Sequence, residues 1–477
     1  MKHLLTMLAL CACLFTAQAQ DKRVLSLEEC ISIAVENNLS VQRSQLNLST
    51  ARVNYENAKG QRYPTLNANG NFGYNWGRGI DPTTNQFTTQ RINFNGVSAN
   101  SSLPLIQGLQ TTNNIRQNKL DVEASELDVK KASNDISLSI SLTYLNVIFN
   151  KELLENARFQ LESGEQQLDR TRKLVQSGAL PVSSELQLVS QVATNEVNLI
   201  IAENNLDLAL LSLKQALLLP SNDEIDIVIP EIEIDQAEIE ETSVSDIYNA
   251  ALDSQPEIES ADKRVQSANL GLAVSKGSMF PSLNLNGGIN TNYSDAFRTF
   301  DVTNITPTGF TPTAFQTASG EAIVEQEFDV ELEGTTVPFS DQYSDNLSKS
   351  LSVGLFVPIF NGFNTRSSIQ RSKINVQQAE ISAVEQRNVL YQSIESAYRN
   401  AIAAAKTFSA SQRQVEALEE TFRSIENQYN LGSSNFTDYQ VASNNLFQAR
   451  SDLSRAKYDF VFKQKVLDFY QGKPLTF

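Results

Sequence analysis

The sequence predicts a mixed α and β membrane protein, in which long α-helical coiled-coil rods join transmembrane β-strands and the whole unit occurs twice. Three observations carry this prediction. They are an internal duplication, a seven-residue apolar repeat in two long segments without proline, and an apolar/polar alternation of period two beside each segment. At 477 residues the chain is long enough for several globular domains, but these patterns favour one extended object.

The first residues have the pattern of a secretory signal. Lys2 precedes an apolar stretch over residues 4–15, and Ala17-Gln18-Ala19 is a small-x-small cleavage site. We therefore expect a signal peptide at residues 1–19, cleaved after Ala19. Cleavage before Cys11 or Cys13, as in a lipoprotein, is the less favoured alternative because it would leave a very short apolar core.

Composition excludes several classes of function. The 55 acidic residues outnumber the 38 basic ones, for a net charge of −17, which argues against a nucleic-acid partner. The only His, His3, lies in the expected signal with two of the three Cys, so the mature chain would keep Cys30 alone. A His base and a soft-metal site are thereby excluded for one chain, and G-x-S-x-G is absent. We expect no enzyme activity, catalytic residue, cofactor or metal site.

The chain contains two copies of one unit. Residues 58–67 resemble residues 275–284 at an offset of 217, and residues 103–108 resemble residues 357–362 at an offset of 254. The second copy therefore has 37 extra residues between Pro281 and Pro358. We assign repeat 1 to residues 20–220, an acidic equatorial joint to residues 221–242, and repeat 2 to residues 243–473.

Each repeat contains a predicted rod. Apolar residues recur every seven positions at Ile140, Val147, Leu154, Leu161, Leu168 and Val175 in repeat 1, and at Ile394, Ala401, Phe408, Val415, Phe422 and Tyr429 in repeat 2. The pattern predicts long helices over residues 109–177 and 363–431. Gly178 and Gly432 then predict tips at residues 178–182 and 432–436, followed by return helices over residues 183–219 and 437–470. A hydroxyl residue is expected to cap each return helix.

Beside each rod the apolar period changes from seven to two. The alternation predicts a β-hairpin at residues 65–105 and another at residues 282–358, the second with a long outer loop at residues 294–346. In each repeat we expect a helix before the hairpin. A phase change predicts a bulge near Gly96. A half-buried soluble sheet is the alternative for any one segment, whereas strands of about ten residues also suit a transmembrane barrel. Four strands cannot close a barrel, so two, three or four chains would have to associate.

The acidic joint alternates apolar and acidic residues over residues 225–235. This pattern predicts a short amphipathic strand packed on the midsection of the rods. An acidic metal-binding strip is the less favoured alternative, because runs of charge are usually solvated faces.

The order of these elements resembles the TolC-type outer-membrane efflux protein family, also called outer membrane factors, over essentially the entire mature chain. The residues that carry the resemblance are Pro64, Pro281, Pro104-x-x-x-Gly108, Pro358-x-x-x-Gly362, Gly178, Gly432, Leu446-Phe447-Gln448-Ala449-Arg450, Ala456, Tyr458 and Leu467. The resemblance implies a homotrimer in the cell outer membrane, with four strands per chain forming a twelve-stranded transmembrane β-barrel. A long α-helical coiled-coil barrel would continue through the periplasm and hold most of the mass.

The implied function is the exit duct of a tripartite efflux or type I secretion system. Its partners would be outer-membrane lipid, a periplasmic adaptor (membrane fusion) protein and an inner-membrane transporter, and the transporter would set most of the substrate selectivity. The alternative is a non-transport stalk or adhesin anchored in the outer membrane by a β-barrel. The outer loop at residues 294–346, which holds the 37 extra residues, would lie outside the cell.

The resemblance also implies a closable periplasmic entrance at the tips, near Gly178 and Gly432. The entrance tyrosine and aspartate of the family match Tyr429 and Asp438. Departures are Val441 at a second aspartate position, Ser434 at the tip arginine, and Ser184 at a partner aspartate, with Glu185 beside it. We expect Asp438 to form a ring of three acids that favours cations. The alternative is that Asp438 only stabilises the first turn of its helix.

Overall fold

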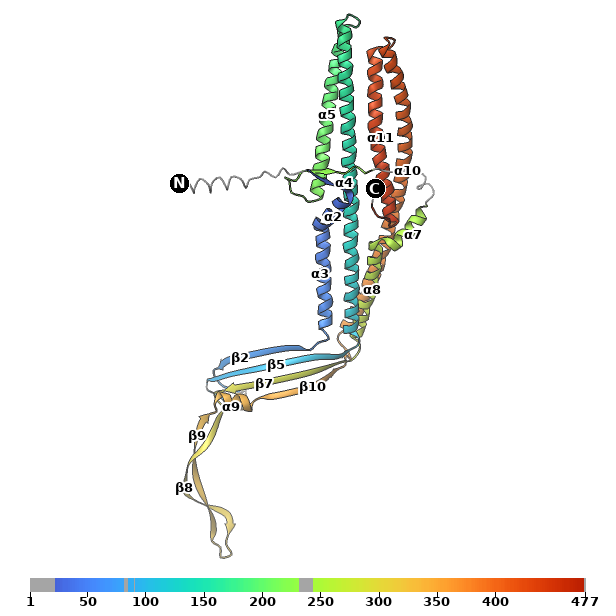
Figure 1. The fold of residues 1–477 in the computed structure, drawn as a ribbon. Coiled ribbons are helices and arrows are strands. Elements are labelled where there is room, and N and C mark those ends of the chain that lie inside the picture. Colours follow the sequence, from blue (N-terminus) through green and yellow to red (C-terminus); the bar gives the residue numbers. More distant parts are fainter. Residues whose placement is uncertain (1–21, 81–84, 90, 231–242, 476–477) are drawn as a thin grey trace, which may run out of the picture. The chain divides into compact units, whose positions relative to one another are not determined.

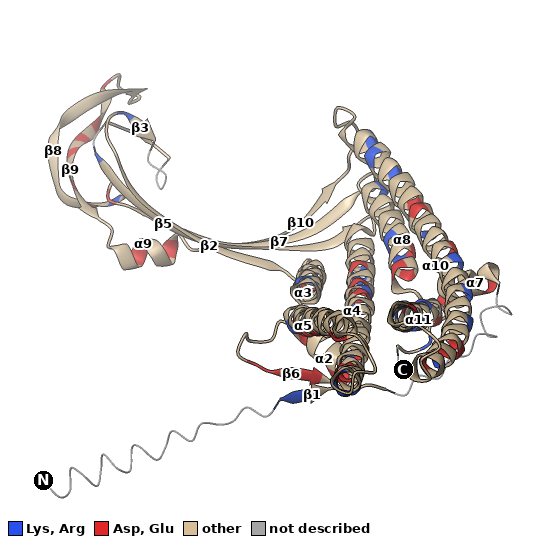
Figure 2. Ribbon diagram, turned by 90° about the horizontal axis from the view of Figure 1, so that it is seen from above, with Lys and Arg blue, Asp and Glu red and all other residues tan. Residues whose placement is uncertain are grey.

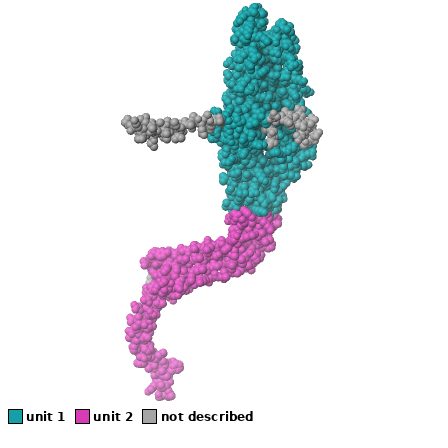
Figure 3. Space-filling model, viewed as in Figure 1, with its two compact units in different colours: residues 1–53, 118–269, 374–477 teal, residues 54–117, 270–373 magenta. Residues whose placement is uncertain are grey.

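The computed structural model describes residues 22–80, 85–89, 91–230 and 243–475, so the expected signal peptide and residues 231–242 of the joint lie outside the described part. The chain divides into two compact units, coloured separately in Figure 3. One comprises residues 1–53, 118–269 and 374–477 and is built from helices. The other comprises residues 54–117 and 270–373 and contains the large sheet.

Apart from a short helix in the second outer loop, the described helices occur as matched pairs of equal length, which is the duplication in structural form (Figure 1). The pairs are α2 (Leu27–Asn37) and α7 (Val244–Ser254) with 11 residues, α3 (Leu39–Gly60) and α8 (Pro256–Gly277) with 22, α4 (Gln110–Gln176) and α10 (Asn364–Asn430) with 67, and α5 (Val182–Ala216) and α11 (Phe436–Tyr470) with 35. At a rise of about 1.5 Å per residue, α4 and α10 are each about 100 Å long. Over the described residues, no helix combines the length and the apolar character that crossing a membrane demands.

The seven-residue repeat forms the apolar seam between each long helix and its return helix, that is, between α4 and α5 and between α10 and α11. Its members Ile140, Val147, Leu154 and Leu168 on α4, and Ile394, Ala401, Phe408 and Val415 on α10, are all less than 10% exposed. Leu154 packs with Ala157 against Ala202 of α5, which runs back along α4. Apolar burial along this seam is what holds each return helix on its long partner.

A short parallel pair of strands, β1 (Arg23–Leu25) and β6 (Ile225–Ile227), packs on the midsection of α4. Tyr144 donates its hydroxyl hydrogen to the carbonyl oxygens of Leu25, at 3.1 Å, and Val228, at 2.5 Å. Lys151 lies 2.5 Å from the Asp226 carboxylate. Burial alone would raise the pKa of Asp226, but hydrogen bonds from Lys151 and the Ile227 N–H lower it. A strand therefore does form in the joint.

The large sheet is antiparallel with the order β10-β7-β5-β2. Its strands are β2 (Thr65–Asn75), β5 (Ile92–Gln107), β7 (Ser282–Ser294) and β10 (Ser348–Phe356). The predicted bulge near Gly96 is wrong, because β2 and β5 pair without interruption from Asn75 and Ile92 to Thr65 and Ser102. The irregularity lies instead between Pro104 and Ile106, opposite β7. Pro104 has no N–H for the ladder, which is why the register breaks there.

The connections at the far end of the sheet contain further regular structure. The strands β3 (Gly79–Ile80) and β4 (Phe87–Thr88) form a small antiparallel pair. The outer loop predicted at residues 294–346 contains two long strands, β8 (Arg298–Gln316) and β9 (Ala322–Thr336), and the short helix α9 (Phe339–Asp345). The apolar/polar alternation in the sequence did not predict β8, β9 or α9.

Candidate functional site

The tips of the two helical hairpins end in the same backbone motif. Gly178 and Gly432 have φ values of +79° and +75°, in the left-handed region that favours glycine. The N–H of Ala179 donates to the Leu174 carbonyl at 2.9 Å, and the N–H of Ser433 donates to the Gln428 carbonyl at 2.9 Å. These are the bonds of a Schellman motif, which satisfies the last carbonyls of each long helix and turns the chain sharply.

The return helices begin differently from the prediction. The expected hydroxyl caps are wrong: α11 is capped by Asn435, whose side chain accepts from the Asp438 N–H at 2.9 Å, and α5 follows Pro181 with no side-chain cap. An Asn side-chain oxygen can accept from an N–H in the first turn of the helix as well as a hydroxyl can, which explains why Asn435 caps α11. In α5, Pro181 lies just before the first turn, and its missing N–H is no loss at that position.

An aromatic cluster closes the end of the second hairpin. Tyr429 stacks on Tyr439 with ring centroids 5.1 Å apart, and Phe436 lies 6.2 Å from Tyr429. The cluster packs against Leu168 and Leu188 of the first hairpin, so apolar contact joins the two tips. Burial raises the pKa of Tyr439 to about 12, with Glu426 and Tyr429 adding to the shift. Within the described residues the Tyr429 hydroxyl is buried without a hydrogen-bond partner.

Polar contacts also cross between the hairpins, and two of them lie toward the tips. Arg170 of α4 donates to the side-chain oxygen of Asn430, at the end of α10, at 2.8 Å. Farther from the tip, Gln440 of α11 donates to Gln191 of α5. Sequence reasoning missed both contacts. The partners are 260 and 249 residues apart, and no local pattern marks them.

The Gln440–Gln191 contact continues into the first hairpin. Gln191 donates to the side-chain oxygen of Asn195 at 2.8 Å, and Asn195 donates to the Gln160 carbonyl of α4 at 3.1 Å. Asn195 is only 3% exposed. A chain of amides thus runs from α11 through α5 to α4, and a buried polar group that is satisfied in this way fixes the geometry of its neighbours.

The residues predicted for the entrance lie at the tips, but in separate surroundings. Asp438 is exposed, and its carboxylate accepts from Ser434 at 3.5 Å. Glu185 pairs at 3.1 Å with Arg172 of its own hairpin, next to the half-buried Ser184. Val441 exposes 53% of its surface. Tyr429 therefore belongs to the contact between hairpins, whereas Asp438 faces solvent on its helix.

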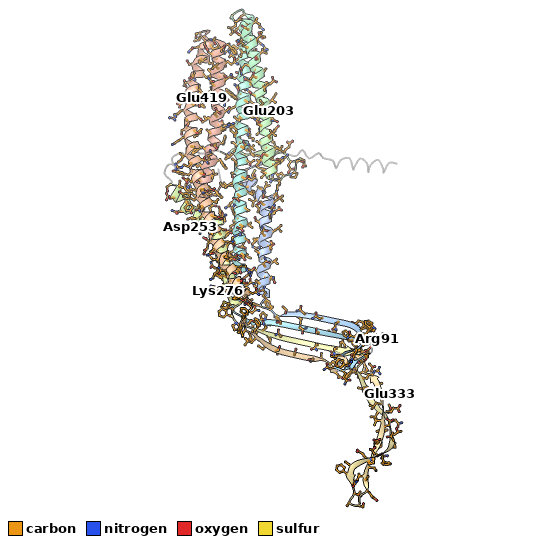
Figure 4. The ribbon with its side chains drawn as sticks, turned by 180° about the vertical axis from the view of Figure 1, so that it is seen from behind. Arg91, Glu203, Asp253, Lys276, Glu333 and Glu419 are labelled. Carbon is orange, nitrogen blue, oxygen red and sulfur yellow. The ribbon has the colours of Figure 1, made fainter. Side chains whose placement is uncertain are left out.

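A cavity of about 370 Å³ lies between the hairpins, on the side of the aromatic cluster away from the tips. Its wall combines aromatic, amide and charged side chains, including Phe422, Gln160 and Glu426. Glu419, labelled in Figure 4, forms an ion pair of 2.7 Å across its edge with Arg450 of α11. In the described part of the chain, no three His, Cys, Asp or Glu side chains gather as a metal site.

The large sheet presents apolar side chains outward. Leu66, Phe72 and Trp76 of β2 and its end are 65–77% exposed, and Phe72 and Tyr74 make an edge-to-face contact at 5.3 Å. Aromatic rings near the end of a strand are typical of the interface between a membrane and water. The sheet thus provides an exposed apolar surface that is suited to lipid.

Comparison with known proteins agrees with this arrangement. The chain is 22% identical over 378 residues to outer membrane protein TolC of Escherichia coli K12, covering 78% of this chain and 69% of that protein. It is 23% identical over 439 residues to the cation efflux system protein CusC of the same organism, covering 90% of this chain and 82% of that protein.

Solved structures share the fold. The outer membrane protein VceC of Vibrio cholerae superposes with a TM-score of 0.71 at 14% identity, covering 94% of this chain and 97% of that one. The crystal structure of CusC superposes with a TM-score of 0.70 at 17% identity, covering 97% and 96%. The family model described as outer membrane efflux protein matches residues 30–217 and 247–472. Both repeats are thus matched, and the chain is a member of the outer membrane efflux protein family, with the outer membrane as its location.

Proposed function

We propose that three copies of this chain form an outer-membrane exit duct that receives substrates from a periplasmic adaptor protein and an inner-membrane transporter. The observation that carries the proposal is the four-stranded sheet. Its outer strands β2 and β10 each have one edge without a partner among the described strands. Unpaired backbone groups are not tolerated in lipid, so the edges must pair with other copies.

Three copies would supply twelve strands, an even number within the range of closed outer-membrane barrels. The matched helices support the same assembly, because each chain then contributes two equivalent hairpins to one helical tube. TolC and CusC, the relatives above, support transport rather than simple anchoring. CusC is named as part of a cation efflux system.

Two measurements test the proposal together. Native mass spectrometry of the detergent-solubilised protein should give a trimer, and the same preparation in planar bilayers should give discrete conductance steps. A stalk or adhesin would give neither a continuous pore nor conductance. Absence of conductance from an intact trimer with its tips opened by mutation would refute the duct.

The entrance proposal places one Asp438 per chain at the mouth of the duct. Three exposed carboxylates around one axis would attract cations and raise their local concentration. Asp438 also lies in the first turn of α11, where an acid stabilises the helix dipole, and this role alone would leave ion selectivity unchanged when the charge is removed.

A further inference from the structure

Strands β8 and β9 form a two-stranded ribbon that projects beyond the large sheet. They pair antiparallel from Arg298 and Thr336 to a turn where Gly320 has a φ of +85°. Among the described strands, no third strand pairs with either. A two-stranded ribbon by itself is marginally stable in water, so packing against one of its faces would be needed to stabilise it.

The base of the ribbon is held firmly. Gln342 of α9 is 1% exposed and donates to the Ser294 and Val337 carbonyls, both at 2.9 Å. Its side-chain oxygen accepts from the Ser294 N–H at 3.0 Å. Because Ser294 precedes the ribbon and Val337 follows it, one side chain fixes both of its ends. The base of the ribbon is therefore fixed in position by hydrogen bonds to Gln342.

One face of the ribbon is apolar and exposed. It contains Val324, Phe328, Val330 and Leu332 of β9 with Phe300, Val302, Ile305 and Phe310 of β8, which are 43–67% exposed. The pairs Val302–Leu332 and Ile305–Val330 lie directly opposite, and Pro307 lies opposite Phe328.

Bulges in β8 keep this face continuous. The register shifts at three places, between Val302 and Asn304, between Pro307 and Gly309, and between Pro312 and Gln316. The first two shifts each add one residue to β8, so that its apolar positions remain opposite those of β9 although their spacing is irregular. These two bulges therefore maintain an apolar surface along the ribbon.

The opposite face is acidic. Glu325, Glu327, Asp329, Glu331 and Glu333 occupy alternate positions of β9, and Asp301 lies across from Glu333. Figure 2 shows acidic residues along β9, and Figure 4 labels Glu333. The only basic residue between residues 298 and 336 is Arg298. Carboxylates about 7 Å apart on one face repel each other and hold that face in water.

These features restrict what can cover the apolar face. Lipid is unsuitable, because the free edges of a two-stranded ribbon would be left unpaired in hydrocarbon. Pairing edge to edge with another copy is disfavoured, because Pro307 and Pro312 lack N–H groups and the acidic rows would lie side by side. Packing face to face between copies satisfies both constraints, since every acidic face then points outward.

We propose that the apolar faces of the β8–β9 ribbons from the copies of one assembly pack against each other above the barrel. The proposal rests on the proposed trimer, which places one ribbon per chain at the same rim. The ribbons would form a small apolar core with an acidic outer surface at the mouth of the duct.

Two neighbouring residues on opposite faces provide a matched test. Val330→Cys places a thiol on the apolar face, and Asp329→Cys places one on the acidic face of the same strand. Cys30 of the unsubstituted chain is fully buried and should not form a disulfide with another chain. After mild oxidation of the full-length protein in outer membranes, we expect disulfide-linked chains from Val330→Cys at a yield at least tenfold above that from Asp329→Cys. Phe328→Cys, on the apolar face, should behave like Val330→Cys.

The outcomes separate this inference from the proposed function. A trimer by native mass spectrometry without preferential cross-linking of the apolar-face variants overturns the ribbon contact and leaves the duct standing. Equal cross-linking of both faces also overturns it, because the contact would then not depend on the face. If no oligomer forms, the proposed function and this inference both fail.

Discussion

Replacing Arg170 with Ala should weaken the closed arrangement of the tips. Arg170 makes the hydrogen bond to Asn430 that joins α4 to the end of α10, and both residues are exposed. A hydrogen bond to a charged group in this setting contributes about 1 kcal/mol after solvent screening. A closed trimer would contain three such bonds, so the variant should lose about 3 kcal/mol. That corresponds to a roughly hundredfold rise in the ratio of open to closed entrances, at about 1.4 kcal/mol per factor of ten.

The assay is single-channel recording in planar bilayers, scored as open probability. Lys173→Ala is the matched control, because Lys173 lies one turn away on α4 and pairs with Asp169 of the same helix. It removes the same charge without crossing between the hairpins. The double variant Arg170→Ala, Asn430→Ala should open no more than either single variant, since both remove one bond. An open probability for Arg170→Ala equal to that of Lys173→Ala would refute the reasoning.

Three further predictions concern the tips. Asp438→Asn should lower cation selectivity and block by polyvalent cations in bilayer recordings, with Asp169→Asn as the control; unchanged values for Asp438→Asn would leave only the role at the helix start. Burial raises the pKa of Tyr439 to about 12, so the contribution of its protonated hydroxyl to stability is complete below about pH 10 and is lost as the pH rises towards 12. Tyr439→Phe should remove one tyrosinate that titrates near pH 12 from the ultraviolet absorbance. An unaltered titration would contradict this. Gly432→Ala should destabilise its tip by about 1–2 kcal/mol, and Gly432→Asn by less, because Asn tolerates φ of +75° better; limited proteolysis of the tip measures this, and equal cleavage of the two variants would count against it.

The rods could be predicted because their signal is local and repeated. A seven-residue apolar period over six positions, with glycine at the end, fixes a helix and its stop without knowledge of any partner. The equal lengths of α4 and α10 then follow from the constant offset between Gly178 and Gly432.

The contacts between hairpins could not be predicted in the same way. Arg170 and Asn430 meet only because two separate helices end at the same level, and neither residue type is unusual at a helix end. Gln191 and Gln440 are neutral amides among many. Their roles depend on tertiary packing, which the duplication does not reveal because the contacts are not repeated.

The prediction of a bulge near Gly96 was wrong for a different reason. A change in apolar phase can come from an extra residue or from a strand whose faces simply exchange character. At Gly96 the strand continues in register, and Asn71 lies so close that a Cβ there would be 2.9 Å from its side-chain oxygen. In β8 the opposite occurs, because the residues added at its register shifts hide from the sequence an alternation that is present in the strand.

The matched lengths of α4 and α10 also constrain how such a protein can change in length. Removing one heptad from α4 and its return helix alone would draw that tip back by about 10 Å and separate Arg170 from Asn430. Removing a heptad from both hairpins would shorten the tube and leave the tips level. The two hairpins must therefore change in length together. A shortened variant that still folds and assembles should be obtainable only by equal deletions in the two repeats.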